Sequence, residues 1–444
     1  MSNMPQTSRK KALLVCAALP QLGSAGNLSY LYAFLDYLDS RQFGATILIV
    51  GYRLPKLLFR LSNYIPFRNV RLAGDGLLRF GDWILVLKPG AWRRAIYGGL
   101  VDSKFALLKE FAARLRRRHV SEAQVVMGHF AGPAEVAASQ RWIARSKADF
   151  VLIDTIFLSA FGRNPPDGAR SIIITHDVFH QRFASFVSRD IKVTPVITAA
   201  TERDALKGFD TIVAISGEDA SVFASLEPNA RIVVFPSPVT PAAKTVTAEP
   251  APSGGILFIG SKTSHNVDGL LWFLEDVWPG VRQRHPSATL NVAGSVCEEI
   301  PGDYAGVVKH HIVKDLAQVA RRAGFAINPI RSGSGLKIKM LDYLANGLPF
   351  VTSQLGAQGF PRGDEEPFIV CDDAPSFCEA VNLLLGDPET LRSMSQRCAP
   401  YAQQFSRDSL FAKLDAAFFY KAIAQSPWQP ATKSPSSNET SVSL

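Results

Sequence analysis

The stretch INPIRSGSGLKIKMLDYLANGLPFVT, Ile327 to Thr352, decides the fold class of this chain. It begins with the end of an apolar run near Asn328, which is followed by a glycine-containing loop and a helical pattern from Leu336 to Asn346. A second apolar run, Pro349 to Thr352, predicts the next strand. Strand, helix and strand in this order predict a parallel sheet covered by helices.

The same rhythm of short apolar runs and helical patterns extends over most of the 444 residues. In the first half, strands are predicted at Ala12 to Ala17, Thr46 to Val50, Gln124 to Met127, Phe150 to Ile153, Ser171 to Ile174 and Thr211 to Ile215. In the second half, they are predicted at Ile256 to Ile259, Thr289 to Ala293, Ala326 to Asn328, Pro349 to Thr352 and Phe368 to Val370. We therefore expect two α/β units of similar size.

A proline-rich stretch separates the two predicted units. Five prolines lie between Pro236 and Pro252, and large apolar residues are almost absent there, which is typical of a linker. We expect a disordered N-terminus over 1–9, an N-terminal domain over 10–240, a linker over 241–253 and a C-terminal domain over 254–405. A last helix, Leu410 to Ala424, is expected within 406–425, and the Ser/Thr/Pro-rich residues 426–444 are expected to be disordered.

The loop in the opening stretch is a candidate phosphate-binding site. Its two glycines, Gly333 and Gly335, let backbone N–H groups approach an anion, and the following helix points its partial positive charge at the same place. Arg331 and Lys337, which we place in the first helical turn, add full charges, and Lys339 lies on a different face. Asp342 follows Gly335 by roughly 10 Å of helix, a reach that suits a ribose. The alternative is a glycine-rich connection with surface lysines.

The stretch INPIRSGSGLKIKMLDYLANGLPFVTSQLGAQGF resembles the donor-binding segment of the group 1 retaining glycosyltransferases. ILFIGSKTSHNVDGLLWFLEDVWP at 256–279, THDVFHQRF at 175–183 and FDTIVAISGEDA at 209–220 are similar to further segments of that family, in the same order. The resemblance implies a GT-B fold, in which two Rossmann-like α/β/α domains face each other across a central cleft and a C-terminal helix returns to the N-terminal domain. Residues 40–145 resemble nothing in it.

The resemblance also implies roles for residues. The two glutamates of the family's motif fall here on Ser334 and Asp342, so Asp342 can serve the ribose, whereas Ser334 supplies no carboxylate. Lys337 would bind the diphosphate, and His176 would line the acceptor and sugar side. The other donor-binding positions implied are Gly23, Gly26 and Asn27 of the first loop, Gly260 and Ser261 at a strand end, His311, Ile312 and Val313 beside the base, and Arg331, Gly335 and Leu336. Asp177 and His180 are expected to be structural partners.

The implied activity is transfer of a hexosyl group from a nucleoside diphosphate sugar to a hydroxyl of a glycan or lipid-linked acceptor, with retention, in bacterial surface polysaccharide or glycolipid synthesis. No Asp-x-Asp motif occurs, so we expect no metal and no cofactor beyond the donor substrate. Ser334 in place of Glu keeps open a scaffold protein without turnover, and a sugar-nucleotide epimerase of the same fold is a third alternative. A nicotinamide oxidoreductase is disfavoured because the dinucleotide glycine fingerprint is absent.

The net charge of +9 is concentrated in one segment. Residues 51–118 hold 15 Lys and Arg against 4 Asp and Glu, mixed with aromatic residues such as Trp83 and Trp92. From Asp102 to Arg118 the apolar residues recur at helical spacing. This pattern is typical of a segment that contacts an anionic membrane surface or an anionic lipid-linked acceptor. A solvated surface helix is the alternative, and nucleic acid is disfavoured because no recognition module accompanies the charge.

The apolar run Ala12 to Leu19, after Arg9, Lys10 and Lys11, imitates a secretory signal. It is too short to cross a bilayer, which needs about 20 residues, and Val15 is too bulky for a lipoprotein cleavage site before Cys16. The 5 cysteines are odd in number and show no metal-knuckle spacing. We therefore expect a cytoplasmic protein with reduced thiols that is peripheral on the inner face of the membrane.

Overall fold

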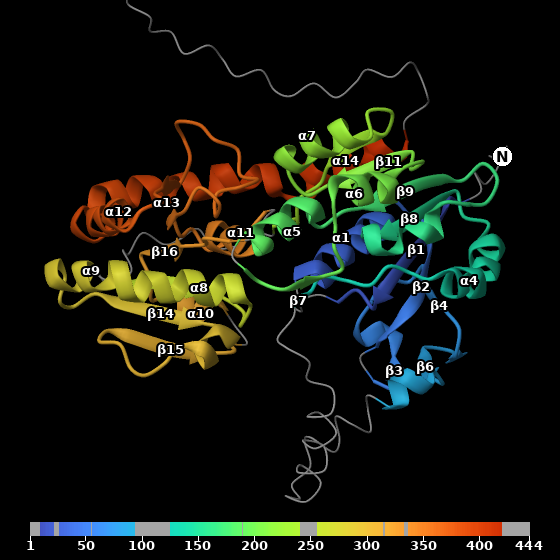
Figure 1. Ribbon diagram of the computed structural model, residues 1–444, viewed down its shortest axis with the longest axis horizontal. Helices are drawn as coiled ribbons and strands as arrows, with labels where there is room; N and C mark the ends of the chain where they lie inside the picture. Colours follow the sequence, from blue (N-terminus) through green and yellow to red (C-terminus); the bar gives the residue numbers. More distant parts are fainter. Residues whose placement is uncertain are drawn as a thin grey trace, which may run out of the picture.

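The computed structural model of the chain describes residues 9–21, 26–54, 56–93, 125–188, 190–239, 255–313, 316–332 and 336–419. Two parallel sheets, each covered by helices, form an N-terminal and a C-terminal domain (Figure 1). This is the two-unit α/β architecture predicted from the alternating pattern. None of the described helices is long and apolar enough to span a bilayer.

The N-terminal domain is built on a seven-stranded sheet of order β12-β11-β9-β8-β1-β2-β4. Its strands are β1 (Lys11–Ala18), β2 (Gly44–Arg53), β4 (Val70–Ala73), β8 (Phe150–Asp154), β9 (Arg170–Ile174), β11 (Thr211–Ala214) and β12 (Arg231–Val234). Its helices are α1 (Gly26–Ser40), α4 (Pro133–Ser146), α5 (Phe179–Val187), α6 (Ala199–Leu206) and α7 (Gly217–Leu226). The central strands are continuous apolar runs because helices cover both faces of the sheet.

The C-terminal domain has a six-stranded sheet of order β15-β14-β13-β16-β17-β18. Its strands are β13 (Gly255–Ile259), β14 (Thr289–Ala293), β15 (Val307–His311), β16 (Phe325–Asn328), β17 (Phe350–Thr352) and β18 (Phe368–Val370). Its helices are α8 (Ser264–Trp272), which continues through a π-helical turn (Phe273–Val277) into α9 (Trp278–Arg284), α10 (Leu316–Ala320), α11 (Ile338–Ala345), α12 (Ala374–Gly386) and α13 (Pro388–Ala402).

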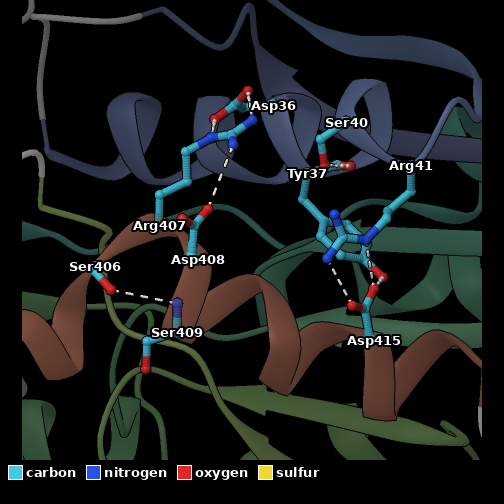
Figure 2. Close-up of polar contacts among 9 residues, drawn as sticks. All are labelled: Asp36, Tyr37, Ser40, Arg41, Ser406, Arg407, Asp408, Ser409 and Asp415. Carbon is cyan, nitrogen blue, oxygen red and sulfur yellow. Dashed lines mark hydrogen bonds and ion pairs between the residues drawn. The ribbon is translucent and has the colours of Figure 1, made fainter.

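The last described helix, α14 (Arg407–Phe418), returns to the N-terminal domain, as expected. Its Arg407 pairs with Asp36 of α1, and its Asp415 pairs with Arg41, which directly follows α1 (Figure 2). The helix begins at Arg407, three residues before the predicted start at Leu410. The Ser406 side chain accepts from the Ser409 N–H and so caps the helix at this point. Its expected C-terminal residues beyond position 419 lie outside the described part of the chain.

Two small sheets were not predicted. Three antiparallel strands, β3 (Leu58–Arg60), β6 (Trp83–Val86) and β5 (Leu77–Phe80), form one sheet at the extremity of the N-terminal domain, away from the C-terminal domain (Figure 1). The predicted strand Gln124 to Met127 is β7 (Val125–Val126), and it pairs with β10 (Val193–Thr194) instead of joining the main sheet. Strands β4, β12 and β15 were also missed, because all three are edge strands of mixed polarity.

Several expectations concern residues outside the described part of the chain. These are most of the expected disordered N-terminus, the linker 241–253, the amphipathic segment Asp102 to Arg118 and the tail 426–444. Gly23 of the expected loop, Ser334 and Gly335 lie outside it too. Gly26 and Asn27 were expected in that loop, but both belong to the first turn of α1.

Candidate active site

His176 lies directly after β9, at the carboxyl edge of the N-terminal sheet. Its Nε2 is 2.6 Å from Oδ1 of Asp154, the last residue of the neighbouring strand β8. A carboxylate only accepts, so Nε2 carries the hydrogen of this bond. The Tyr30 ring of α1 meets the imidazole edge-on, with centroids 5.3 Å apart. The imidazole is thus held in one orientation by a carboxylate and an aromatic ring.

Asp177 and His180 have structural partners, as expected. The Asp177 carboxylate accepts from Arg182 Nη1 at 3.0 Å. His180 Nδ1 is 2.6 Å from Oε2 of the buried Glu202, whose carboxylate also accepts the N–H groups of Phe179 and His180. Glu202 therefore serves as an acceptor for the first turn of α5, and it fixes the loop that carries His176.

Lys337 lies between the two domains. It is the N-cap of α11, with extended backbone, because the helix begins at Ile338 and not at Leu336. The expectation that Lys337 sits in the first helical turn was therefore wrong. The side chain is partly buried and feels the charges of Asp177, Arg182 and Asp219 of the N-terminal domain. Figure 1 accordingly shows α11 beside α5.

Burial and charge shift several pKa values around Lys337. Burial lowers the pKa of Lys337 itself to about 8, against the attraction of Asp177. Burial and then the charge of Asp177 raise the pKa of Asp219 to about 7. Burial, followed by Lys339 and Lys337, lowers the pKa of His265 to about 3. Groups from both domains thus form one electrostatic cluster, which is the arrangement expected where a charged ligand binds.

Asp219 and Arg182 keep unused hydrogen-bonding capacity within this cluster. Asp219 is 2 % exposed, and its Oδ2 has no hydrogen-bond partner among the described residues. The buried Nε of Arg182 has none there either. Sequence reasoning did not single out Asp219, although its position after a buried strand and an N-cap serine is a recognisable signal.

Lys339 makes its hydrogen bond and its cation–π contact within the C-terminal domain. Its Nζ donates to Asn266 Oδ1 at 2.8 Å and lies 4.5 Å from the centre of the Phe258 ring. Burial lowers the pKa of Lys339 well below its usual range, and the charge of Lys337 adds to the effect. Two lysines with costly charges at one helix start favour an anionic ligand, which would stabilise both.

The strand ends of the C-terminal sheet pack tightly at Gly260. A Cβ on Gly294, which has φ +107°, would lie 2.1 Å from the Gly260 carbonyl oxygen, so only glycine fits there. The Asn266 side-chain amide donates to the Ser261 hydroxyl oxygen at 3.2 Å. Lys262 is turned outward to Glu298, Nζ to Oε2 2.9 Å. The backbone at the end of β13 therefore stays close to α8 and α11.

The remaining predicted donor residues lie at the same edge of the C-terminal sheet. His311 ends β15 with φ +53°, and its carbonyl accepts from Gly294 N–H; Ile312 is 77 % exposed. The Arg331 guanidinium lies over the Trp272 ring, 5.4 Å from its centre. Asp342 has an exposed surface on α11, and desolvation of its carboxyl by the surrounding protein raises the pKa to about 6. Leu336 is buried.

The domains touch directly beside Lys337. Gly359, with φ +86°, would place a Cβ 3.0 Å from Cβ of Ser216 in the N-terminal domain and 3.2 Å from that of Leu336. Two parallel α/β sheets in contact at such a seam, with a last helix that returns to the first domain, define the GT-B class of protein.

Comparisons with known proteins agree with this class. The solved structures that resemble the chain include sucrose-phosphate synthase from Thermosynechococcus elongatus, with 13 % identity, TM-score 0.58 and coverage of 93 % of this chain and 98 % of that one. WaaG, a glycosyltransferase involved in lipopolysaccharide biosynthesis, is 13 % identical, with a TM-score of 0.56 and coverage of 92 % of this chain and 99 % of WaaG. A mutant of S. aureus TarM in complex with Fondaparinux, alpha-GlcNAc-glycerol and UDP is 10 % identical, with a TM-score of 0.61 and coverage of 92 % of this chain and 99 % of the TarM chain. At these identities the likeness shows the fold.

The family comes from the sequence. Residues 253–387, most of the C-terminal domain, match the family model described as Glycosyl transferases group 1, and the chain has the GT-B fold. An uncharacterized 44.6 kDa protein in cps region of Klebsiella pneumoniae is 25 % identical over 138 residues, which are 28 % of this chain and 36 % of that protein. The chain thus matches about a third of the length of this relative.

Proposed function

We propose that this chain is a retaining, metal-independent hexosyltransferase that moves a sugar from a nucleoside diphosphate sugar to a hydroxyl of a glycan or lipid-linked acceptor. The observation that carries the proposal is the position of Lys337, at the start of α11 and between the charged groups of both domains. A diphosphate placed there would meet the Lys337 ammonium and the N–H groups of the helix start.

In the proposed reaction, the bond between the anomeric carbon and the diphosphate oxygen breaks, and the diphosphate takes the electron pair. The acceptor oxygen bonds to the same carbon on the same face, and its proton passes to the departing phosphate. Charge therefore grows on the diphosphate, and preorganised donors and cations at that group lower the barrier. Lys337 and the α11 amides would supply them, without a protein nucleophile.

The other residues take the roles that the family resemblance implies. Arg331, Ser334, Gly335, Leu336, Gly260 and Ser261 would bind the diphosphate and sugar, and Gly23, Gly26 and Asn27 would approach from the N-terminal domain. His311 to Val313 would border the base. Asp342, on the accessible side of α11, would accept from the ribose hydroxyls. His176, oriented by Asp154, would face the sugar and acceptor.

The acceptor class is proposed from context. One relative is named for a cps region, WaaG is named for lipopolysaccharide biosynthesis, and a TarM structure holds UDP together with alpha-GlcNAc-glycerol. We propose a role in bacterial surface polysaccharide or glycolipid synthesis, on the cytoplasmic face of the membrane. The basic residues 51–118 would lie at an anionic membrane surface there.

Incubation of the purified chain with a panel of nucleoside diphosphate sugars, with and without a bacterial lipid and glycan extract, tests this proposal. We expect nucleoside diphosphate release that depends on the extract, and a product whose mass has grown by one hexose and whose anomeric configuration matches the donor. Donor binding without transfer would support the scaffold alternative, which is motivated by Ser334 in place of Glu. Isomerised donor without an acceptor would support the epimerase.

A further inference from the structure

The three-stranded sheet β3-β6-β5 carries apolar residues on its solvent-facing side. Cross-strand partners share a face, so one row is Leu58, Leu85 and Leu78, and the next row is Arg60, Trp83 and Phe80. We call these six residues the outer face. Phe80 is 62 % exposed, Leu58 52 %, Leu78 44 % and Trp83 42 %.

The opposite side of the same sheet already faces the protein core. Phe59, Ile84 and Val86 alternate with the outer-face residues, and each is at most 3 % exposed. An antiparallel sheet with one buried face normally presents polar residues to solvent on the other. The outer face breaks this alternation, and an apolar, aromatic surface of this kind marks an interaction site.

Two cations border the outer face, because Lys56 and Arg60 line a pocket together with Leu58 and Trp83. Residues 56–93 contain seven Lys and Arg but only two carboxylates, Asp75 and Asp82. Both carboxylates are engaged within the fold: Asp82 accepts from the N–H and hydroxyl of Ser62, and Asp75 accepts from Trp142 and pairs with Arg141. Cations therefore outnumber carboxylates in residues 56–93, and both carboxylates have partners within the fold.

A shallow pocket at one margin of the outer face combines the two features. Its volume is about 490 Å³, and it is lined by Lys56, Arg60, Asn63, Tyr64 and Trp83 among others. The Arg60 guanidinium lies 4.9 Å from the centre of the Trp83 ring. Cations, an amide and a phenol next to an exposed indole suit a phosphate headgroup above an apolar phase, where Trp is enriched.

Charge disfavours two other occupants. A second copy paired through the same face would bring Arg60 and Lys56 against their own counterparts. Residues 94–124, which follow this sheet along the chain, carry seven Lys and Arg against three Asp and Glu, so they too would add like charge to the outer face. An anionic surface is the complementary partner.

We infer that the outer face is where this protein contacts a lipid bilayer with anionic headgroups, with Phe80 and Trp83 entering the interface and Lys56 and Arg60 meeting the phosphates. The inference rests on the proposed function, because it names the surface that would bring a glycosyltransferase to a lipid-linked acceptor. Docking by apolar insertion and charge together predicts binding that depends on both aromatic residues and anionic lipid.

Co-sedimentation of the full chain with vesicles tests the inference, without donor or turnover. We expect binding to phosphatidylcholine vesicles that contain 30 % phosphatidylglycerol and at least about tenfold weaker binding to pure phosphatidylcholine. Phe80→Ser with Trp83→Ser should weaken the binding about tenfold, and Lys56→Gln with Arg60→Gln should remove most of the preference for anionic lipid. Leu383→Ser, at a similarly exposed leucine of α12, is the matched control and should bind like the parent.

Equal binding by the parent and the Phe80→Ser, Trp83→Ser variant would overturn the inference, as would indifference to lipid charge. Thermal unfolding and transfer to a soluble acceptor should be unchanged in that variant, so loss of vesicle binding with activity intact separates this inference from the proposed function. Transfer activity without any vesicle binding by the parent would refute the inference alone.

Thiol labelling of a Phe80→Cys variant tests whether something other than a bilayer covers the outer face. The native cysteines are buried or partly buried, so Phe80→Cys should be the fast-reacting thiol towards a maleimide, and anionic vesicles should protect it. Slow reaction without vesicles would show that another part of the chain covers the outer face. A dimer that Phe80→Ser with Trp83→Ser dissociates would show that a second copy does. Either outcome contradicts the inference.

Discussion

Arg41, which directly follows α1, and Asp415 of α14 form a two-pronged ion pair between residues 374 positions apart, Nε to Oδ1 2.8 Å and Nη2 to Oδ2 2.7 Å (Figure 2). The Tyr37 hydroxyl donates to the same carboxylate at 3.0 Å. Beneath this pair the Phe411 ring packs against Tyr37, with centroids 5.3 Å apart. The last described helix is therefore part of the core of the N-terminal domain.

Packing should hold α14 more strongly than charge does. Phe411 is 1 % exposed, so Phe411→Ala should lower the free energy of unfolding by about 3–5 kcal/mol. Asp415→Asn should lower it by at most about 1 kcal/mol, because both partners of the pair are a third exposed, 34 % and 35 %. Denaturant unfolding of both variants checks this difference. Equal losses would contradict the account of how the helix docks.

The Asp415 pair also predicts an effect of acid. The hydrogen bond from Arg41 holds the pKa of Asp415 below its ordinary value. The stability that it contributes is present above the unfolded-state pKa, near 3.9, and is lost as the pH falls through the lower folded-state pKa. Unfolding of the parent between about pH 5 and pH 2 should therefore depend on pH more steeply than that of Asp415→Asn. Parallel curves would contradict it.

Asp219 should make stability depend on pH in the opposite sense. Its pKa is raised to about 7, so the folded state holds a proton that the unfolded state has released. The stability that this proton provides is present below the unfolded-state pKa and is lost as the pH rises through about 7. Asp219→Asn should therefore match the parent near pH 4 and be more stable than it at pH 8.

Melting temperatures at the two pH values measure this effect. Ser216→Ala serves as a control for the first turn of α7, because it removes the hydroxyl that accepts from the Asp219 backbone N–H and keeps the Asp219 carboxylate. That variant should lose stability at both pH values. A difference between Asp219→Asn and the parent that is the same at pH 4 and pH 8 would rule out the raised pKa.

His176 and Asp154 should differ in their effect on the proposed transfer. We expect His176→Ala to lower kcat/KM about 10²-fold to 10³-fold, as the loss of a group facing the reacting atoms does. Asp154→Asn keeps the shape but accepts less strongly, so it should cost about tenfold and shift the pH profile of kcat. His285→Ala, at the end of α9, should change neither. Full activity in His176→Ala would remove its assignment.

Much of the fold could be predicted from the sequence because central parallel strands are continuous apolar runs. Phe150 to Ile153 and Ile256 to Phe258 are buried, and both strands appear where the apolar pattern put them. Edge strands have no such pattern: β15, with Lys309 and His310, takes its structure from its neighbour β14. The three-stranded sheet was missed because its apolar residues on both faces do not alternate with polar ones.

The candidate site was predictable only where it follows a strand. Lys337 and His176 could be found in this way, since ligands bind beyond the carboxyl ends of parallel strands. Their partners could not: Asp154 comes from another strand, and Asp219 is brought near Lys337 only when the two domains meet. The start of α11 was placed two residues early because no capping side chain marks it.

The measurement that tests the central claim most directly is the rate of sugar transfer by Lys337→Ala at saturating donor. Loss of one preorganised cation at the departing diphosphate should lower kcat about 10²-fold to 10³-fold. The melting temperature should not fall, because the folded state holds the Lys337 charge at a cost. Lys337→Arg should recover part of the rate, and Lys262→Ala, whose ammonium pairs with Glu298, should transfer like the parent. Transfer by Lys337→Ala at the parent's rate would contradict the account.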